Sequence, residues 1–248
     1  MARFRRLKLE LRGELAAPDW AARLDARAAA DGAEPLVGPL LALRLDRETL
    51  VRWRAVEGLG RLAARLADAT PERARVLVRT FMWYLNEESG NLGWGIPDAM
   101  GEATARSPRL AAEYGSILAS YIADEPGLDG NFLDHAELRR GACWGLGRLA
   151  EARPERVRPW ARFLVRGLAD ADAGIRGLCA RTLGVLARTT PAGSADEGAA
   201  DVRGAAPALA ALADDGAELE FYDGTAVRRV RVGELAAAAL AALEGAAG

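Results

Sequence analysis

The sequence contains few of the residue types that usually carry chemistry. It has two cysteines and one histidine, and Lys8 is its single lysine, so nearly all of its positive charge comes from arginine. Neither Cys143 nor Cys179 has the spacing of a zinc or disulfide motif, and both stand in apolar, helix-forming surroundings. We expect both to be reduced packing residues, which is typical of a cytoplasmic protein.

Long apolar runs are also missing. No window approaches the roughly 20 apolar residues of a membrane span. The basic start, MARFRRLKLELRGEL, has no apolar run of signal-peptide length. The 33 basic and 35 acidic residues give a net charge of -2, which makes no electrostatic case for nucleic acid. We therefore expect a cytoplasmic protein that has no membrane partner and for which nucleic acid is an unlikely ligand.

Five segments of the chain share one apolar pattern. In each, the first, fifth, ninth and twelfth residues are small or apolar, which places them on one helical face. The segments begin 37 to 57 residues apart, around the roughly 40–47 residues of a HEAT-type helical hairpin. They start at Val51 (VRWRAVEGLGRLA), Leu92 (LGWGIPDAMGEAT), Leu138 (LRRGACWGLGRLA), Ile175 (IRGLCARTLGVLA) and Val232 (VGELAAAALAALE).

A second helical segment precedes each of these and opens at a proline. Proline suits the first helical turn, where its missing N–H is not needed, and Thr70 and Ser107 are good N-caps for two of these helices. The opening prolines are Pro35, Pro71, Pro108, Pro154 and Pro207. The pattern predicts an all-α fold, a HEAT-like right-handed α-solenoid of about five helical hairpins.

We expect one HEAT-like repeat domain over residues 1–248. Residues 1–34 would form an N-terminal cap, and the repeats would span 35–70, 71–107, 108–153, 154–189 and 205–246. The last repeat contains the insert AELEFYDGTAVRRVRV, which alternates around a Gly-containing turn. That alternation predicts a small β-hairpin near residues 217–231.

The segments LRRGACWGLGRLA and IRGLCARTLGVLA give the chain a family likeness. It resembles the bacterial HEAT-like repeat proteins, a group that includes phycobilisome-lyase-type repeats, over roughly residues 35–245. WYLNEESGNLGWGIPDAMGE together with DHAELRRGACWGLGRLA resembles one HEAT-like subfamily more narrowly. The resemblance implies the fold. It transfers no functional residue, because such repeats serve binding scaffolds, bilin lyases and some DNA glycosylases.

One face of the second helices carries tryptophans beside glycines. Glycine within a helix costs about 1 kcal/mol relative to alanine, so a row of them favours close approach of something to the backbone. In HEAT-like arrays this face lines the concave surface, and exposed aromatic patches often mark interaction sites. The predicted groove residues are Trp53, Glu57, Gly60, Trp94, Asp98, Gly101, Arg140, Trp144, Gly147 and Arg181.

Two other interpretations of this face stay open. The glycines can simply let neighbouring second helices pack closely, as we expect for Gly58 and Gly145 on the core side. The N-terminal segment, with Phe4, Leu7 and Leu9, can fold back and cover the tryptophans.

A polar cluster is predicted at the edge where the first helix of a hairpin turns into the second. NEESGN is first of all a hairpin connection. Its polar residues can also face the next insert and orient a ligand or a cation, although no spacing is diagnostic and we assign no metal site. We expect His135 in a first helical turn that Asp134 caps. The cluster consists of Asn86, Glu87, Glu88, Asp134 and His135.

The sequence favours a non-catalytic scaffold that binds a protein or peptide partner in this groove, without a cofactor. Phosphate loops, dinucleotide fingerprints and nucleophile elbows are all missing. Asp98 and Glu102, four residues apart on one helix, can support acid–base chemistry but are more often solvated. The alternatives are a bilin or cofactor lyase or chaperone-like enzyme, and a DNA-base glycosylase in which Trp94 and Asp98 act. The oligomeric state is not readable.

Overall fold

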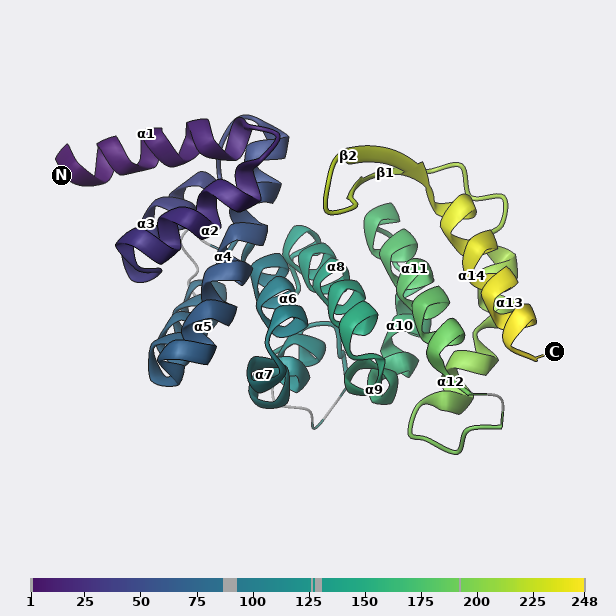
Figure 1. Cartoon of the computed structure of the whole chain (residues 1–248). Coiled ribbons are helices and arrows are strands. Elements are labelled where there is room, and N and C mark those ends of the chain that lie inside the picture. Colours follow the sequence, from purple (N-terminus) through teal and green to yellow (C-terminus); the bar gives the residue numbers. More distant parts are fainter. Residues whose placement is uncertain (1, 87–92, 126, 128–130, 192, 248) are drawn as a thin grey trace.

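The computed structural model describes residues 2–86, 93–125, 127, 131–191 and 193–247. Its helices stand side by side in a curved row, with a two-stranded sheet across one end of several of them (Figure 1). This confirms an all-α solenoid with a small β-hairpin. The elements are α1 (Ala2–Ala16), α2 (Trp20–Asp31), α3 (Glu34–Leu43), α4 (Thr49–Ala69), α5 (Pro71–Asn86), α6 (Ile96–Arg106), α7 (Pro108–Ser120), α8 (Ala136–Ala152), α9 (Pro154–Val157), the 3-10 helix η1 (Arg158–Trp160), α10 (Ala161–Gly167), α11 (Ala173–Thr189), α12 (Ala199–Gly204), α13 (Ala206–Ala211), β1 (Glu218–Tyr222), β2 (Val227–Arg231) and α14 (Val232–Ala247).

The second helices of the hairpins, α4, α6, α8, α11 and α14, form a continuous layer in which each contacts the next. Helices α3, α5, α7, α10 and α13 pack behind them. The apolar stripe found in the sequence is the interface between the two layers. In α4, for example, Val51, Ala55 and Leu59 are fully buried. Burial of this stripe is the main source of stability of such an array.

Proline begins the first helices as the sequence predicts. Pro71, Pro108 and Pro154 are the first residues of α5, α7 and α9. The Ser107 hydroxyl accepts a hydrogen bond from the Leu110 amide at 3.3 Å, which caps α7. None of the helices in the described ranges is both long and apolar enough to cross a membrane.

Several helix glycines lie where two second helices approach closely. A methyl group at Gly101 of α6 would overlap the backbone of Gly145 in α8, and one at Gly60 of α4 would overlap Glu102. At Gly184 of α11 it would lie 3.0 Å from the Cα of Ala239. The glycines therefore serve packing between neighbouring second helices, the alternative that the sequence left open, and the predicted glycine floor of a groove is wrong.

The N-terminal segment is a helix, α1, that packs on α2, α3 and α4. Phe4 and Leu9 remain exposed on it. This helix covers the end of the solenoid, so the alternative in which it lies over the tryptophans is wrong.

The β-hairpin covers Trp53 and Trp144 instead. β1 and β2 pair antiparallel, with Leu219 opposite Val230. The Asp223 carboxylate accepts hydrogen bonds from the amides of Thr225 and Ala226 and fixes the turn. From the last repeat the hairpin extends back along the layer toward α4 (Figure 1).

Candidate functional site

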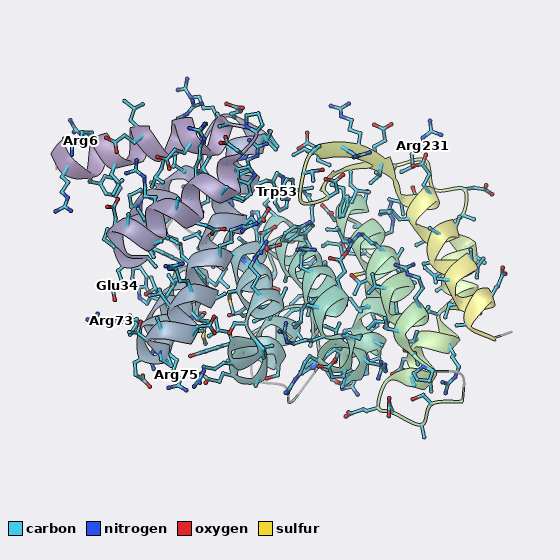
Figure 2. All side chains as sticks on the ribbon, in the orientation of Figure 1. Arg6, Glu34, Trp53, Arg73, Arg75 and Arg231 are labelled. Atoms are coloured by element: carbon cyan, nitrogen blue, oxygen red, sulfur yellow. The ribbon has the colours of Figure 1, made fainter. Side chains whose placement is uncertain are left out.

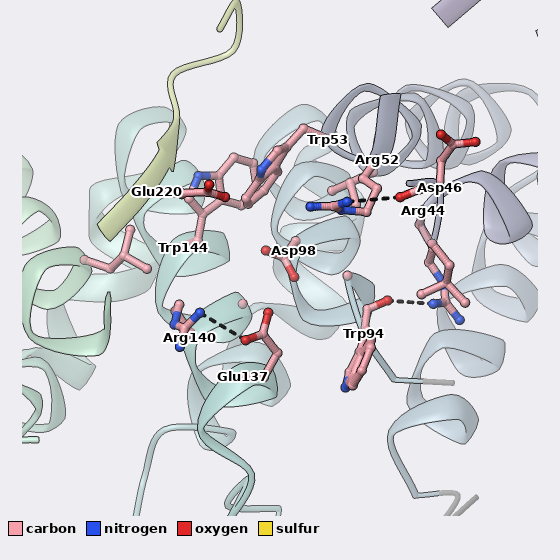
Figure 3. Close-up of a pocket in the computed structure, with 15 residues that line it drawn as sticks. Arg44, Asp46, Arg52, Trp53, Trp94, Asp98, Glu137, Arg140, Trp144 and Glu220 are labelled. Atoms are coloured by element: carbon pink, nitrogen blue, oxygen red, sulfur yellow. Dashed lines mark hydrogen bonds and ion pairs between the residues drawn. The ribbon is translucent and has the colours of Figure 1, made fainter. Parts of the chain in front are cut away.

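A cavity of about 380 Å³ opens at the N-terminal ends of α4, α6 and α8 and is bordered by β1 (Figure 3). Its wall combines three tryptophans with seven charged side chains. The lining residues are Arg44, Leu45, Asp46, Arg52, Trp53, Val56, Trp94, Gly95, Asp98, Glu137, Arg140, Gly141, Trp144, Leu178 and Glu220.

Two of the tryptophans form a fixed wall with a tyrosine from the hairpin. The Trp53 ring stacks on the Tyr222 ring, with centroids 5.3 Å apart and planes 13° apart, and lies 4.8 Å from the Trp144 ring. The Trp144 indole N–H donates to the Tyr222 carbonyl at 3.2 Å. Figure 2 shows Trp53 between the N-terminal helices and the hairpin. Trp144 is only 3% exposed, so this wall is partly core.

The third tryptophan lies at the rim. Trp94 is 44% exposed, just before α6, and Figure 3 shows its ring apart from the other two. Its carbonyl accepts a hydrogen bond of 2.6 Å from the Arg44 guanidinium. Gly95, the N-cap of α6, has φ of +74°, a conformation that favours glycine and places Trp94 outside the helix.

Asp98 lies at the centre of the cavity (Figure 3). It is 8% exposed, and desolvation raises the pKa of its carboxyl to about 7. A hydrogen bond from its own backbone amide and the Arg140 charge oppose this shift, and the Glu137 charge adds to it. Its carboxylate forms no ion pair with any described arginine; Arg140 acts on it only through space. A methyl group at Gly141 would overlap this carboxylate, so the glycine makes room for it.

The arginines of the cavity, in contrast, are held by fixed partners. Arg52 donates to the Asp46 carbonyl at 3.0 Å and to the Thr49 hydroxyl at 2.9 Å. Arg140 donates to both carboxylate oxygens of Asp172, at 3.1 and 2.6 Å. It also donates to Glu137 at 3.0 Å. Burial lowers the pKa of Arg44 to about 10, and that residue donates to the Trp94 carbonyl.

Beside the cavity, an alternating row of charges crosses the second helices. We call it the charge ladder. Arg106 bridges Glu57 and Glu102, each at 2.7 Å, and Arg148 bonds Glu102 at 2.6 Å. The row continues from Arg148 through Glu151 to Arg181. The charge ladder comprises Glu57, Arg61, Glu102, Arg106, Arg148, Glu151 and Arg181. It ties neighbouring hairpins together with charges that satisfy one another.

The structure divides the predicted groove residues into two sets. Five line the cavity: Trp53, Trp94, Asp98, Arg140 and Trp144. The other five lie elsewhere: Glu57 and Arg181 belong to the charge ladder, and Gly60, Gly101 and Gly147 lie at contacts between second helices. The face that the sequence treats as one groove is therefore a cavity at one end and an ion-paired surface along the rest.

The predicted edge cluster is only partly within the described residues. Asn86 ends α5 and is exposed, and Asp134 and His135 are exposed before α8. The N-cap of α8 is His135 itself, so the expectation that Asp134 caps this helix is wrong by one residue. Glu87 and Glu88 lie outside the described residues. Within the ranges that the structure describes, no group of three or more metal-ligating side chains is present.

Sequence reasoning missed the cavity residues that loops and the hairpin contribute. Arg44 and Asp46 come from the connection between α3 and α4, and Glu220 comes from the insert in the last repeat. Tyr222 of the same insert does not line the cavity but stacks on Trp53, which does. The only signal was that hairpin inserts lie on this same edge of a solenoid. No pattern indicated that the insert would reach Glu57, 165 residues earlier.

The two cysteines are buried packing residues, as predicted, and they are neighbours. Cys143 of α8 and Cys179 of α11 are free, with sulfurs 3.7 Å apart. The contact with Cys143 and burial together raise the pKa of the Cys179 thiol.

Comparisons with known proteins agree with the fold. No family model and no curated protein matches the chain. Among solved structures, it is similar to a designed armadillo repeat protein in complex with the peptide (KR)4, with a TM-score of 0.59, 18% identity, and coverage of 98% of this chain and 92% of that one.

A computationally designed armadillo repeat protein for modular peptide recognition gives a TM-score of 0.55 at 17% identity, with 97% and 92% covered. An engineered protein gives 0.58 at 18% identity, with 96% and 88% covered. At such identities the likeness concerns the fold. The helical-repeat part of the resemblance is confirmed, while the phycobilisome-lyase type stays a prediction.

Proposed function

We propose that the protein is a non-catalytic scaffold that binds a protein or peptide segment, with one side chain of the partner anchored in the cavity. The observation that carries this proposal is the exposed Trp94 at the rim of a cavity whose remaining aromatic wall is rigid. A large aromatic surface next to a preformed hollow is typical of binding hot spots. The armadillo repeat proteins designed for peptide recognition are compatible with this use of the fold.

A selection from a displayed peptide library tests the proposal. We expect enriched peptides to bind the wild-type protein and to lose about tenfold or more in affinity on Trp94→Ala, as an anchor contact of about 1.4 kcal/mol requires. Trp83→Ala is the matched control, because Trp83 is similarly exposed at 55% but lies on α5 and does not line the cavity. Peptides that lose affinity equally in both variants, or a selection that enriches nothing, would contradict the proposal.

A DNA-base glycosylase is the second candidate, because Trp94 and Asp98 share the cavity, as that alternative requires. Against it, the lining arginines are bound to carbonyl and carboxylate groups and provide no free path for phosphates. Release of methylated bases from alkylated duplex DNA, lost on Asp98→Asn, would favour this candidate over the scaffold.

A further inference from the structure

Some charged side chains of the cavity have partners within the protein, and others form no ion pair. Each lining arginine already donates to a group of the protein itself, and Asp46 is bonded by Arg12 at 2.8 Å. Glu137 is engaged with Arg140. Asp98 and Glu220 are the lining carboxylates that form no ion pair within the described residues. These two carboxylates are therefore the lining acidic groups that remain for a cationic ligand.

Asp98 is the stronger candidate of these two carboxylates for binding a ligand. Glu220 is exposed on β1 and can be solvated, whereas Asp98 is more than nine-tenths buried and points into the cavity. A buried carboxylate without an ion-pair partner has an uncompensated desolvation penalty. A cation bound beside it offsets that penalty. Trp53 and Trp94 line the same cavity, and aromatic rings attract cations through their quadrupole.

We propose that this cavity takes a cationic group, the ammonium or guanidinium of a basic side chain in the partner segment, with Asp98 as its counter-ion and the tryptophans as its walls. This inference rests on the proposed scaffold function and specifies the chemistry of the anchoring side chain. The lining arginines already donate to acceptors of the protein itself, which leaves the Asp98 carboxylate as the buried charge that faces the centre of the cavity.

The indole N–H signals provide a direct measurement. The chain has six tryptophans. Trp53, Trp94 and Trp144 line the cavity, so their indole signals report on binding there. Trp20, Trp83 and Trp160 do not line it, so their signals serve as internal references. Titrate the full-length, 15N-labelled protein with the amides of N-acetyl-lysine, N-acetyl-arginine and, as the neutral counterpart, N-acetyl-norleucine.

We expect the two cationic probes to shift the cavity indoles saturably and norleucine amide to do so at least about tenfold more weakly. Asp98→Asn keeps the shape of the side chain and removes its charge. It should weaken the binding of the lysine probe by about tenfold and leave the signals of the reference indoles unchanged. Glu137→Gln changes an exposed carboxylate and should have the smaller effect. Equal binding of the neutral probe, or full binding by a folded Asp98→Asn protein, would overturn the inference.

The pH dependence distinguishes Asp98 from the other charges. Glu137 and Arg140 from α8, Arg44 and Asp46 from the α3–α4 connection, Arg52 from α4 and Glu220 from β1 all face the same cavity. With a carboxyl pKa of about 7, the affinity for lysine amide should rise about tenfold from pH 6 to pH 8, because only the carboxylate form binds a cation. Asp98→Asn should abolish this rise, whereas a rise that persists would contradict the assignment.

Failure of this inference and failure of the scaffold function are distinguishable. Selected peptides that depend on Trp94 but contain no basic residue would overturn the cationic anchor and leave the scaffold standing. Lysine-containing peptides that bind no better than free lysine amide would show that the site takes small cations, which overturns the assigned source. Replacement of lysine by norleucine in a selected peptide should reduce its affinity by the same factor as Asp98→Asn, with no additional loss when both are changed.

Discussion

Helix α6 carries two buried carboxylates one turn apart that differ in their ion-pair partners. Glu102 is 1% exposed and Asp98 is 8% exposed. Glu102 lies between Arg106 and Arg148, with ion-pair distances of 2.7 and 2.6 Å. Asp98 faces the cavity and has no such partner among the described residues. One helix thus borders both the charge ladder and the cavity.

The contrast separates a structural charge from a binding charge. Where a buried carboxylate supports the fold, the chain supplies arginines from neighbouring helices, and the charges satisfy one another. Where a buried carboxylate has no ion-pair partner, part of the desolvation penalty is still present in the free protein. A cation from outside can remove it, which makes the unpaired group a source of binding free energy.

The largest loss of stability should come from breaking the charge ladder. Glu102→Ala leaves Arg106 and Arg148 without their shared partner in a mostly buried position, and we expect a loss of about 3 kcal/mol of unfolding free energy. Urea denaturation at pH 7 measures it. A loss below about 1 kcal/mol would mean that Glu57 and Glu151 satisfy the two arginines alone.

At Asp98, one helical turn from Glu102, we expect a stability change of the opposite sign when the charge is removed. The folded-state pKa of Asp98 is about 7, against an ordinary value of 3.8, so between these pH values the folded chain retains a proton that the unfolded chain loses. Stability therefore falls as pH rises from about 4 to 7, and the penalty is complete above that range. Asp98→Asn removes it and should stabilise the protein by roughly 2–4 kcal/mol at pH 8.

The same substitution provides its own control through pH. At pH 5 the gain should shrink to less than half, because the wild-type carboxyl is then mostly protonated in the folded state. Urea denaturation of both proteins at the two pH values gives the comparison. Destabilisation at pH 8 would show that Asp98 has a compensating partner.

The helical layers were predictable from sequence because they follow from periodicity. The stripe through Val51, Ala55 and Leu59 repeats in each second helix, and Pro71 and Pro108 open their helices as predicted. These features depend on neighbours within one or two turns, which a sequence displays directly.

The cavity was only half predictable because its geometry depends on contacts between distant segments. Trp94 and Asp98 could be placed on one face by spacing. The division between Asp98 and Glu102 could not, because it depends on which arginines of α6 and α8 lie within reach. The placement of Tyr222 against Trp53 likewise depends on a hairpin that crosses from the last repeat to α4.

A smaller effect should arise where the hairpin joins the cavity to the ladder. The Tyr222 hydroxyl donates to the Glu57 carboxylate at 2.9 Å, so Tyr222→Phe removes one hydrogen bond to a charged acceptor and keeps the ring stacking. We expect a loss of about 1.5 kcal/mol, measured by thermal unfolding. Tyr84→Phe, on α5 and outside the cavity lining, is the control and should change little.

Trp94→Ala should have the smallest effect on stability and still a large one on binding. Its side chain is 44% exposed, and its hydrogen bond to Arg44 uses the backbone carbonyl, which the substitution keeps. Unfolding free energy should therefore change by about 0.5 kcal/mol or less. Trp53→Ala removes a ring that stacks on Tyr222 and contacts Trp144, so it should lose several times more unfolding free energy. If Trp94→Ala were as destabilising as Trp53→Ala, Trp94 would be part of the core. The distinction between structural and binding groups, drawn from Glu102 and Asp98, would then not apply to the tryptophans of the cavity.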